Sequence, residues 1–289
     1  MSAVVEYLFV VNEAAGPGHG FTARLVDDAA RALGGARRVS CASPDEVRAL
    51  VRDLPAGAVP VAVGGDGTVN RLAEALRAES AAARPWGVLP AGTGNAFAHS
   101  LGIRNPAEAV EALLGGSVVA IDAMATSCPD VPLALVSLST GFEGSFLRRL
   151  AARRARSRIW SAAIGLAASA GRRRRGVRLI ADGEEILSPE ERSYSAGFYN
   201  MRCYAFGRAM VPEADPRDGL AHAVVYRDAS GYWRAIGGRD PARSPGLRRA
   251  FRRARLETEH AVQFDGEAAP PGRYDVWVEP AALRVFARR

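Results

Sequence analysis

The stretch Val61-Ala-Val-Gly-Gly-Asp-Gly-Thr-Val-Asn70 decides the fold class of this chain. A short β-branched run stops at a glycine-rich turn, and apolar residues then recur at helical spacing from Val69 to Leu76. Phosphate groups bind at such turns, because glycines let the backbone come close and free N–H groups at the helix start point at the anion. Asp66 would repel phosphates unless a divalent cation lay between them. The loop therefore predicts a metal–nucleotide site, and hence an enzyme.

Composition limits the classes of protein to which the chain can belong. It has 289 residues, of which 48% are hydrophobic and 24% charged, as expected for two soluble domains with sizeable cores. The longest nearly uncharged helical candidate, Ile159–Ala170, is too short to cross a bilayer. Cys41, Cys128 and Cys203 form no C-x-x-C pair, so neither a zinc site nor a disulfide framework is expected, and the cytoplasm is favoured.

The basic residues are unusual, because all 38 are arginines and the chain has no lysine. The formal net charge is +7, and genome composition is the simplest reason for this bias, since alanine and glycine are also abundant. A P-loop needs a lysine that holds phosphates, and no G-x-x-x-x-G-K-[ST] motif occurs. P-loop nucleotidases are therefore excluded.

The first 120 residues alternate between strand and helix patterns. This alternation predicts a layered α/β domain over 1–121 with a largely parallel sheet, whose ligands bind at the carboxyl ends of the strands. The predicted strands are Tyr7–Val11, Val59–Val63 and Trp86–Leu89, and the predicted helices are Phe21–Leu33, Pro44–Leu54, Val69–Ala78 and Ala96–Leu101.

The pattern changes near Ile121. Short β-like runs separated by Gly, Pro and Asp turns predict an antiparallel β-sandwich domain over 122–289. One helical insertion, 146–171, interrupts it, and the last strand is free to pack back on the first domain. The predicted strands are Leu133–Leu138, Val177–Ile180, Ala221–Tyr226, Ala261–Phe264, Tyr274–Val278 and Leu283–Phe286.

A second glycine-rich loop, Leu89-Pro-Ala-Gly-Thr-Gly-Asn95, follows its strand as the first loop does. Thr68, Thr93 and Asn95 add hydroxyl and amide groups that suit phosphates. With both loops, the chain resembles the diacylglycerol kinase catalytic-domain family, which includes bacterial lipid kinases and the sphingosine and ceramide kinases. The matching pieces, in family order, are Gly64–Thr68, Pro90–Asn95, Phe97–Ala98, Leu101–Ile103, Gly141–Glu143, Pro212–Asp215, Asp218–Leu220 and Asp265–Glu267.

The resemblance implies a two-domain lipid kinase that transfers phosphate from ATP, with Mg²⁺, to a lipid hydroxyl in a cleft between the domains. Phosphoryl transfer needs positioned phosphates, magnesium to neutralise their charge and a group near the acceptor hydroxyl. Asp66 is implied to act on magnesium through water. The residues implied to bind the nucleotide are Asn12, Gly64, Gly65, Asp66, Gly67, Thr68, Gly92, Thr93, Gly94 and Asn95.

Four acids of the second domain have two interpretations each. On sequence alone, Asp265-Gly-Glu267 is a turn with two solvated acids, Asp122 is a cap residue and Asp218 begins an Asp-Gly turn. The resemblance implies that Asp265 is the general base for the lipid hydroxyl, with Glu267 in support. An alcohol is too weak an acid to ionise first, so the aspartate would receive its proton as transfer proceeds. Asp122 is implied to extend the metal–water network, and Asp218 to hold a structural Mg²⁺ with nearby carbonyls.

The chain departs from the family pattern at three places. Ala96 stands where many bacterial diacylglycerol kinases have an aspartate, an early motif survives only as Asn12-Glu-Ala-Ala-Gly16, and Arg208 replaces a small residue. These departures leave open a decayed kinase that only senses nucleotide or lipid, although retention of Asp66, Asp265 and Glu267 argues against full decay. A second alternative is an NAD kinase-like enzyme, which shares the Gly-Gly-Asp-Gly loop and the two-domain plan, but the second loop lacks the Asn-Glu pair expected of NAD kinases.

Three arginine-rich segments, Arg148–Arg158, Arg172–Arg175 and Arg248–Arg255, could bind an anionic bilayer or simply form solvated surface. No nucleic-acid-binding module accompanies this charge, so nucleic acid is not an expected partner. The expected partner is a lipid substrate at an anionic membrane surface, and a homodimer is left open. The expected location is the cytoplasm, peripheral at the inner membrane face.

Overall fold

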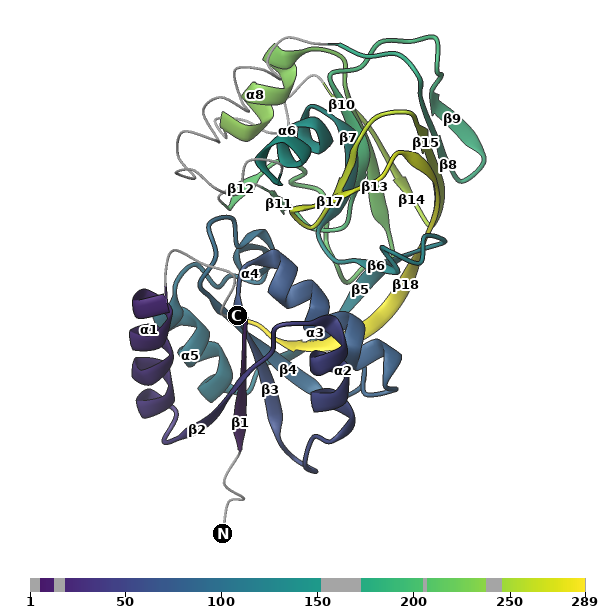
Figure 1. The fold of residues 1–289 in the computed structure, drawn as a ribbon. Coiled ribbons are helices and arrows are strands. Elements are labelled where there is room, and N and C mark those ends of the chain that lie inside the picture. The colour runs from purple at the N-terminus through teal and green to yellow at the C-terminus, as the bar shows by residue number, and fades with distance from the viewer. Residues whose placement is uncertain (1–5, 13–18, 152–172, 205–206, 238–245, 289) are drawn as a thin grey trace. The chain divides into compact units, whose positions relative to one another are not determined.

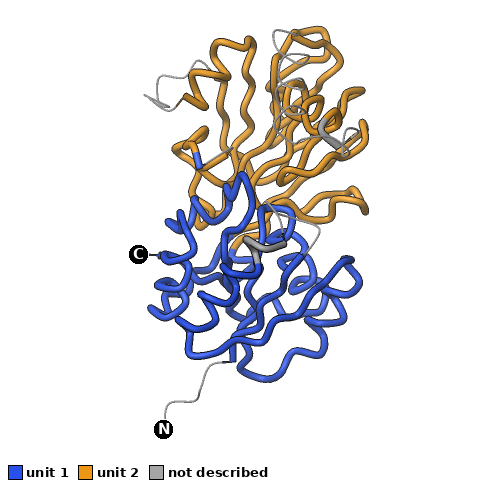
Figure 2. Tube along the Cα trace, turned by 60° about the vertical axis from the view of Figure 1, so that its left-hand side comes forward, with its two compact units in different colours: residues 1–121, 205–207, 281–289 blue, residues 122–204, 208–280 orange. Residues whose placement is uncertain are grey.

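The computed structural model describes residues 6–12, 19–151, 173–204, 207–237 and 246–288. The chain divides into two compact units (Figure 2). Unit 1 comprises Met1–Ile121, Ala205–Gly207 and Ala281–Arg289, and unit 2 comprises Asp122–Tyr204 and Arg208–Pro280. One long strand, β18 (Gly272–Phe286), contributes residues to both units.

Unit 1 is built on a parallel sheet with the strand order β2-β1-β3-β4, and the end of β18 adds a fifth parallel strand beside β4 (Figure 1). All residues of β1 and β3 are buried, as expected for strands with both faces covered. Helices α1 and α5 contact each other, as do α2 and α3. The strands are β1 (Tyr7–Val11), β2 (Ala36–Ser40), β3 (Val59–Gly64) and β4 (Pro85–Pro90), and the helices are α1 (His19–Ala32), α2 (Pro44–Arg52), α3 (Asp66–Ala78), α4 (Ala96–Ser100) and α5 (Pro106–Gly115).

Local sequence fixes where two of these helices begin. Ser43 accepts a hydrogen bond from the Glu46 amide at 3.2 Å, and the Glu46 carboxylate accepts one from the Ala42 amide at 2.8 Å. This capping box satisfies amides that have no partner inside α2. Asn105 caps α5 in the same way, by accepting from the Glu108 amide at 3.0 Å.

Unit 2 contains two large antiparallel sheets and the two-stranded antiparallel sheet β11-β12. Sheet I consists of the first part of β18 with β15, β8 and β9, and β5, which pairs with β6, also pairs with β18. Sheet II has the order β14-β13-β10-β7-β16-β17. The strands are β5 (Val118–Thr126), β6 (Leu133–Ala134), β7 (Ser137–Gly141), β8 (Val177–Ala181), β9 (Glu184–Leu187), β10 (Ser195–Tyr199), β11 (Cys203–Tyr204), β12 (Arg208–Ala209), β13 (Ala221–Tyr226), β14 (Leu247–Phe251), β15 (Arg253–Thr258), β16 (Val262–Phe264) and β17 (Glu267–Ala269).

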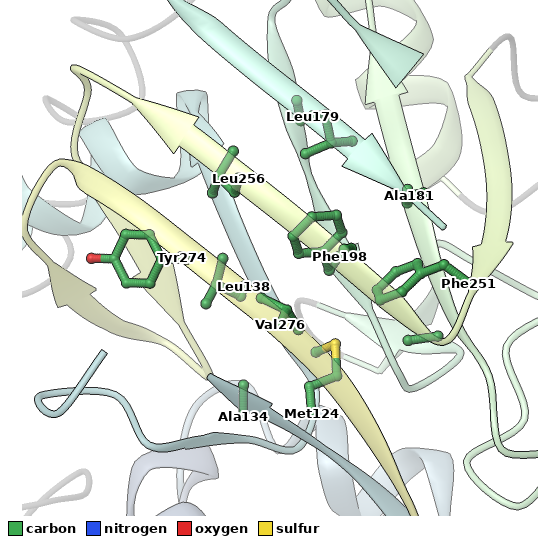
Figure 3. Packing of buried hydrophobic residues seen from close by; sticks show 14 of the residues in the cluster. Met124, Ala134, Leu138, Leu179, Ala181, Phe198, Phe251, Leu256, Tyr274 and Val276 are labelled. Carbon is green, nitrogen blue, oxygen red and sulfur yellow. The ribbon is translucent and has the colours of Figure 1, made fainter. Parts of the chain in front are cut away.

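The main core of unit 2 contains side chains from both sheets (Figure 3). Leu138 and Phe198 of sheet II belong to the same buried cluster as Leu256 and Val276 of sheet I. The rings of Phe198 and Phe251 meet edge to face with centroids 4.9 Å apart. Burial of each large apolar side chain contributes about 1.5–3 kcal/mol, so this layer stabilises unit 2 substantially.

The opposite face of sheet II packs against two helices, α6 (Phe142–Ala151) and α8 (Ala229–Gly237). The Phe142 ring stacks on Tyr194 at 5.2 Å and meets Tyr232 and Trp233 edge to face at 5.3 Å. These contacts form a second, aromatic cluster, distinct from the core between the sheets.

The predicted fold class, a layered α/β domain followed by a mostly antiparallel β domain, is confirmed, but several element predictions are wrong. The run Leu133–Leu138 is split between β6 and β7, while Tyr274–Val278 and Leu283–Phe286 are parts of the single strand β18. The predicted insertion over 146–171 begins earlier, at Phe142, and its residues 152–171 lie outside the described residues. Strand β2 was not predicted, because its two adjacent arginines are exposed and break the apolar pattern of a buried strand.

Within the described residues, none of the helices is both long and apolar enough to span a bilayer.

The packing of α6 on sheet II can be tested at Gly144. A Cβ atom there would lie 1.9 Å from the Ala261 carbonyl oxygen, so the helix would have to move away from the sheet. We expect Gly144→Ala to lower the free energy of unfolding by about 3 kcal/mol in urea titrations. The control Gly115→Ala, also in a helix, meets no atom within 4 Å and should change it by less than about 1 kcal/mol. Equal losses of stability in the two variants would contradict the close packing of α6 on sheet II at Gly144.

Candidate functional site

The two glycine-rich loops begin side by side at the carboxyl edge of the unit 1 sheet. Gly64 at the end of β3 is the register partner of Pro90 at the end of β4. The Ala91 amide donates to the Gly64 carbonyl at 2.9 Å, which continues the ladder one residue beyond the strands. Asn12 follows β1 at the same edge, because Val11 pairs with Val63. The structure thus places the predicted nucleotide-binding residues along one edge.

Beyond the strands, the two loops pack backbone against backbone. A Cβ atom on Gly92 would lie 2.4 Å from the Cα of Gly65 and 2.9 Å from its nitrogen. A Cβ atom on Gly65 would lie 3.2 Å from the Cα of Gly92. Gly92 therefore has no space for a side chain, whereas a Cβ atom at Gly65 would require the loops to separate by a few tenths of an ångström.

The Asp66 side chain ties the first loop to the second. Its Oδ2 accepts a hydrogen bond from the Ala96 amide at 3.1 Å and its Oδ1 accepts one from the Phe97 amide at 2.9 Å. Asp66 therefore caps the N-terminus of α4, where a carboxylate also interacts favourably with the helix dipole. Burial raises the pKa of this carboxyl, and the Phe97 and Ala96 amides partly oppose that rise.

Asn95 shapes the second loop from within. Its backbone is left-handed, with φ of +49°, a region that asparagine tolerates better than most residues. Its Oδ1 accepts from the Gly92 amide at 3.0 Å, and its Nδ2 donates to the Gly92 carbonyl at 2.9 Å. The side chain closes the loop on itself, whereas Thr93 is exposed.

The residues at this edge fit the phosphates of a nucleotide. The first amides of α3 receive no side-chain cap, since its N-cap residue is Gly65. The Thr68 hydroxyl is buried and has no hydrogen-bond partner among the described residues. Helix-start amides together with a hydroxyl are donors that suit an anion. Each Asp66 oxygen accepts one amide and retains capacity for a water of hydrated Mg²⁺.

In unit 2, the acids Asp265 and Glu267 lie in a tight hairpin between β16 and β17, called here the acid turn (Asp265–Glu267). Asp265 is buried, with a left-handed φ of +44°. Its carboxylate accepts three backbone amides, from Leu135 at 2.7 Å, Val136 at 2.8 Å and Ser137 at 2.9 Å. Asp265 is therefore held firmly against the start of β7, not solvated as in an ordinary turn. Glu267 is partly exposed.

Two further predicted metal ligands, Asp122 and Asp218, lie near each other in unit 2. Asp122 is buried, and its Oδ2 accepts from the Gly219 amide at 2.7 Å. Asp218 Oδ1 accepts from the Leu220 amide at 2.9 Å, as in an Asp-Gly turn. Across the described parts of the chain, no three His, Cys, Asp or Glu side chains gather in a way that could hold a metal ion. Asp122 and Asp218 therefore each accept a backbone amide of the same turn, and among the described residues they are not part of a cluster of carboxylates.

Glu143 is a buried acid to which the sequence assigned no role. It lies in the first turn of α6, and its carboxyl accepts from Tyr199 at 3.0 Å, Tyr232 at 3.0 Å and Ser195 at 3.2 Å, as well as from Ser139. Burial raises the pKa of Glu143, and these hydroxyl groups oppose the rise. Burial also raises the pKa values of Tyr199 and Tyr232, and the nearby Glu143 adds to that rise.

Comparison with known proteins agrees with this geometry. The family model of the diacylglycerol kinase catalytic domain matches residues 6–126, which include both loops. Residues 6–126 are thus similar in sequence to a diacylglycerol kinase catalytic domain. The curated protein "Probable lipid kinase YegS-like" of Enterobacter sp. (strain 638) is 47% identical over 64 residues, which is 22% of this chain and only about a fifth (21%) of that relative's length.

Solved structures extend the likeness of fold beyond the catalytic domain. A diacylglycerol kinase from Bacillus anthracis aligns with a TM-score of 0.73 and 19% identity, over 98% of this chain and 97% of that one. An NAD kinase from Archaeoglobus fulgidus, solved in complex with ATP, aligns with a TM-score of 0.51 and 16% identity, over 97% and 93%. At these identities the likeness establishes the two-domain fold alone.

The link between the loops can be tested with Asp66→Asn. The variant loses a charge-assisted acceptor, so we expect the Ala96 and Phe97 amides to exchange with solvent about tenfold faster or more, measured by NMR. The Glu108 amide, which Asn105 caps in the same unit, is an internal control and should not change. Unchanged exchange at Ala96 and Phe97 would show that Asp66 does not cap α4.

The buried carboxyl of Glu143 should make stability depend on pH. In the folded state it keeps its proton above its ordinary pKa of 4.5, whereas the unfolded chain loses it. The folded state then binds more protons, so stability falls as pH rises from that value towards the raised pKa. We compare the free energies of unfolding of the two proteins in urea between about pH 5 and 7. The value for Glu143→Gln should rise relative to that of the wild type by up to about 1.4 kcal/mol per pH unit. A difference that stays constant with pH would refute a raised pKa.

Proposed function

We propose that the protein uses ATP and Mg²⁺ to phosphorylate a hydroxyl of a membrane lipid, with a diacylglycerol or a sphingoid- or ceramide-like molecule as acceptor. The catalytic-domain match and the lipid-kinase relative support the kinase class. The observation that carries the proposal is the pair of glycine loops joined by Asp66, with its set of phosphate donors.

Each part of the nucleotide edge has a role in this proposal. The first amides of α3 and the hydroxyls of Thr68 and Thr93 bind the phosphates. Asp66 orients a hydrated Mg²⁺, which neutralises the charge of the phosphates when it is bound. Gly65 and Gly92 let the loops come close enough for both to contact one triphosphate. Most of the rate enhancement would then come from positioning and electrostatics, as is general for phosphoryl transfer.

Asp265 would receive the proton of the acceptor hydroxyl, with Glu267 beside it in the acid turn. The three amides that hold the carboxylate fix its position. The loose transition state of phosphoryl transfer asks for little proton removal before the new bond forms, so an orienting base is sufficient.

The central test is a labelling assay with the purified chain, radioactive ATP, Mg²⁺ and separate acceptors. The acceptors are diacylglycerol, sphingosine, ceramide, phosphatidylglycerol and NAD. We expect label in one class of lipid. Label in NAD alone would favour an NAD kinase instead. No label in any acceptor, with ATP still bound in a titration, would favour a decayed kinase that senses nucleotide.

The role of Asp265 is tested with Asp265→Asn, which we expect to lower lipid phosphorylation by about 100-fold or more. Asp182→Asn is a matched control. Asp182 also begins an Asp-Gly turn in unit 2 with a left-handed φ of +47°, and it accepts the Arg253 amide at 2.8 Å and the Arg252 amide at 3.1 Å. The control should keep wild-type activity. Equal losses in both variants would indicate a structural role for Asp265.

We further propose that the protein binds the cytoplasmic face of an anionic membrane through its arginines. In the segment Arg248–Arg255, which lies on β14 and β15, Arg249 pairs with Glu184 and Arg255 with Asp275. Arg148 on α6 is exposed, while residues 152–158 and Arg172 of the other two segments lie outside the described residues.

Vesicle sedimentation tests this binding. We expect the chain to sediment with vesicles that contain phosphatidylglycerol and not with purely zwitterionic ones, because each basic residue near the surface contributes about 1 kcal/mol. Binding should weaken as salt is raised, since the Debye length shortens from about 10 Å at 0.1 M to about 3 Å at 1 M. Binding that depends on neither lipid charge nor salt would rule out this mode of docking.

A further inference from the structure

A row of buried polar side chains on sheet II has no part in the reaction as proposed so far. Ser137 and Ser139 lie on the same face of β7, and Gln263 of β16 is the register partner of Ser139. All three residues are fully buried. On the other side of β7, Gly197 of β10 is the partner of Ser139, and a Cβ atom there would lie 2.4 Å from the Ser139 Cβ. The absence of a side chain at Gly197 therefore leaves the room on this face that the Ser139 side chain occupies.

Gln263 joins this row to the acid turn. Its Nε2 donates to Ser139 Oγ at 2.7 Å and to Ser137 Oγ at 3.0 Å, so both of its N–H groups are used. Its Oε1 accepts from the Gly266 amide at 3.2 Å. Ser137 in turn donates its amide to Asp265 and accepts the Asp265 amide at 3.0 Å. The turn is therefore held from two sides, by the main chain of β7 and by one glutamine.

The other end of the row is Glu143. Ser139 Oγ accepts from Gln263 and donates its only proton to Glu143 Oε2. Tyr199 of β10 and Tyr232 of α8 donate to the same carboxyl. The row thus runs from the helices that cover sheet II, through one serine, to the acid turn.

The direction of these bonds fixes the orientation of the glutamine amide. Ser139 donates its proton to Glu143 Oε2, which accepts it both in the carboxylate and in the acid form that carries its proton on Oε1, so Ser139 accepts from Gln263. A flipped amide would turn Oε1 towards the two serines and aim Nε2 at the Gly266 N–H, which leaves donor facing donor in a buried place. One orientation alone satisfies the row, and it is the one that holds Gly266.

We infer that Gln263 is a positioning residue for the acid turn, and that Glu143 sets the orientation of Gln263 through Ser139. This inference rests on the proposed function, because the turn carries the acids assigned to the acceptor hydroxyl. Neither residue touches the reacting atoms. Their effect is to keep Asp265 and Glu267 at fixed positions, and a shift of about 1 Å in such groups can cost about 100-fold in rate.

The first experiment compares Gln263→Leu with Thr140→Val. Thr140 is also buried on β7 but lies on the opposite face, where its hydroxyl donates to the Ala261 carbonyl at 2.9 Å. Gln263→Leu should speed exchange of the Gly266 amide about tenfold or more and lower kcat about 10- to 100-fold, with KM for ATP unchanged. Thr140→Val should lose a similar amount of stability and keep both kcat and Gly266 protection.

The second experiment reverses the hydrogen-bond chain and does not depend on a leucine in the core. In Gln263→Glu alone, Ser139 faces two carboxyl groups but has only one proton to donate. One carboxyl stays without a donor from Ser139, so kcat and the protection of the Gly266 amide from exchange should fall. In Glu143→Gln with Gln263→Glu, the new amide at 143 can donate to Ser139, which can then donate to the carboxylate at 263. We expect this double variant to recover at least about tenfold of the kcat lost in Gln263→Glu.

The outcomes separate this inference from the proposed function. Unchanged Gly266 exchange in Gln263→Leu, or an equal kcat loss in Thr140→Val at equal stability, would overturn the positioning role. No recovery in the double variant would overturn the part assigned to Glu143. If the wild-type chain phosphorylates no acceptor, the proposed function fails, and the exchange measurements alone then decide whether Gln263 holds the turn.

Discussion

The close contact between the backbones of Gly65 and Gly92 sets the geometry of the whole nucleotide edge. The strands β3 and β4 end side by side, so the loops that follow must either separate or touch. They touch because neither glycine has a side chain. This contact brings Asp66 within hydrogen-bond distance of the Ala96 and Phe97 amides, and the carboxylate then starts α4. A residue with a side chain at Gly92 would push the two loops apart and so disturb the Asp66 cap of α4.

Helices and strands whose signals lie close together in the sequence could be predicted well. The β-branched run before Gly64, and the helical spacing after it, identify β3 and α3 from local physics alone. The long-range partners could not be predicted in this way. Asp66 caps a helix 30 residues away, and the amides that hold Asp265 lie about 130 residues earlier in the chain. Such pairs depend on which strands become neighbours, and no local pattern encodes that.

Two features of unit 2 could not be seen in the local sequence. The motif that ends in Glu143 gave no sign that the acid would be buried, because its surroundings come from β10 and α8. In β18, Pro280 and Ala281 looked like a break between two strands. Ala281 does adopt a left-handed φ of +50°, yet the strand continues through it, from unit 2 into unit 1.

The passage of β18 from unit 2 into unit 1 constrains when the unit 1 sheet can be completed. Arg284 and Val285 complete the unit 1 sheet beside β4, but the ribosome makes them only after all of unit 2. Until then, β4 presents an unpaired edge next to the buried Trp86, and such edges recruit strands from other chains. Although domains usually fold in the order in which they are made, this first unit has to wait for the last strand. The β4 edge of unit 1 is therefore paired only after the strands of unit 2 have been synthesised.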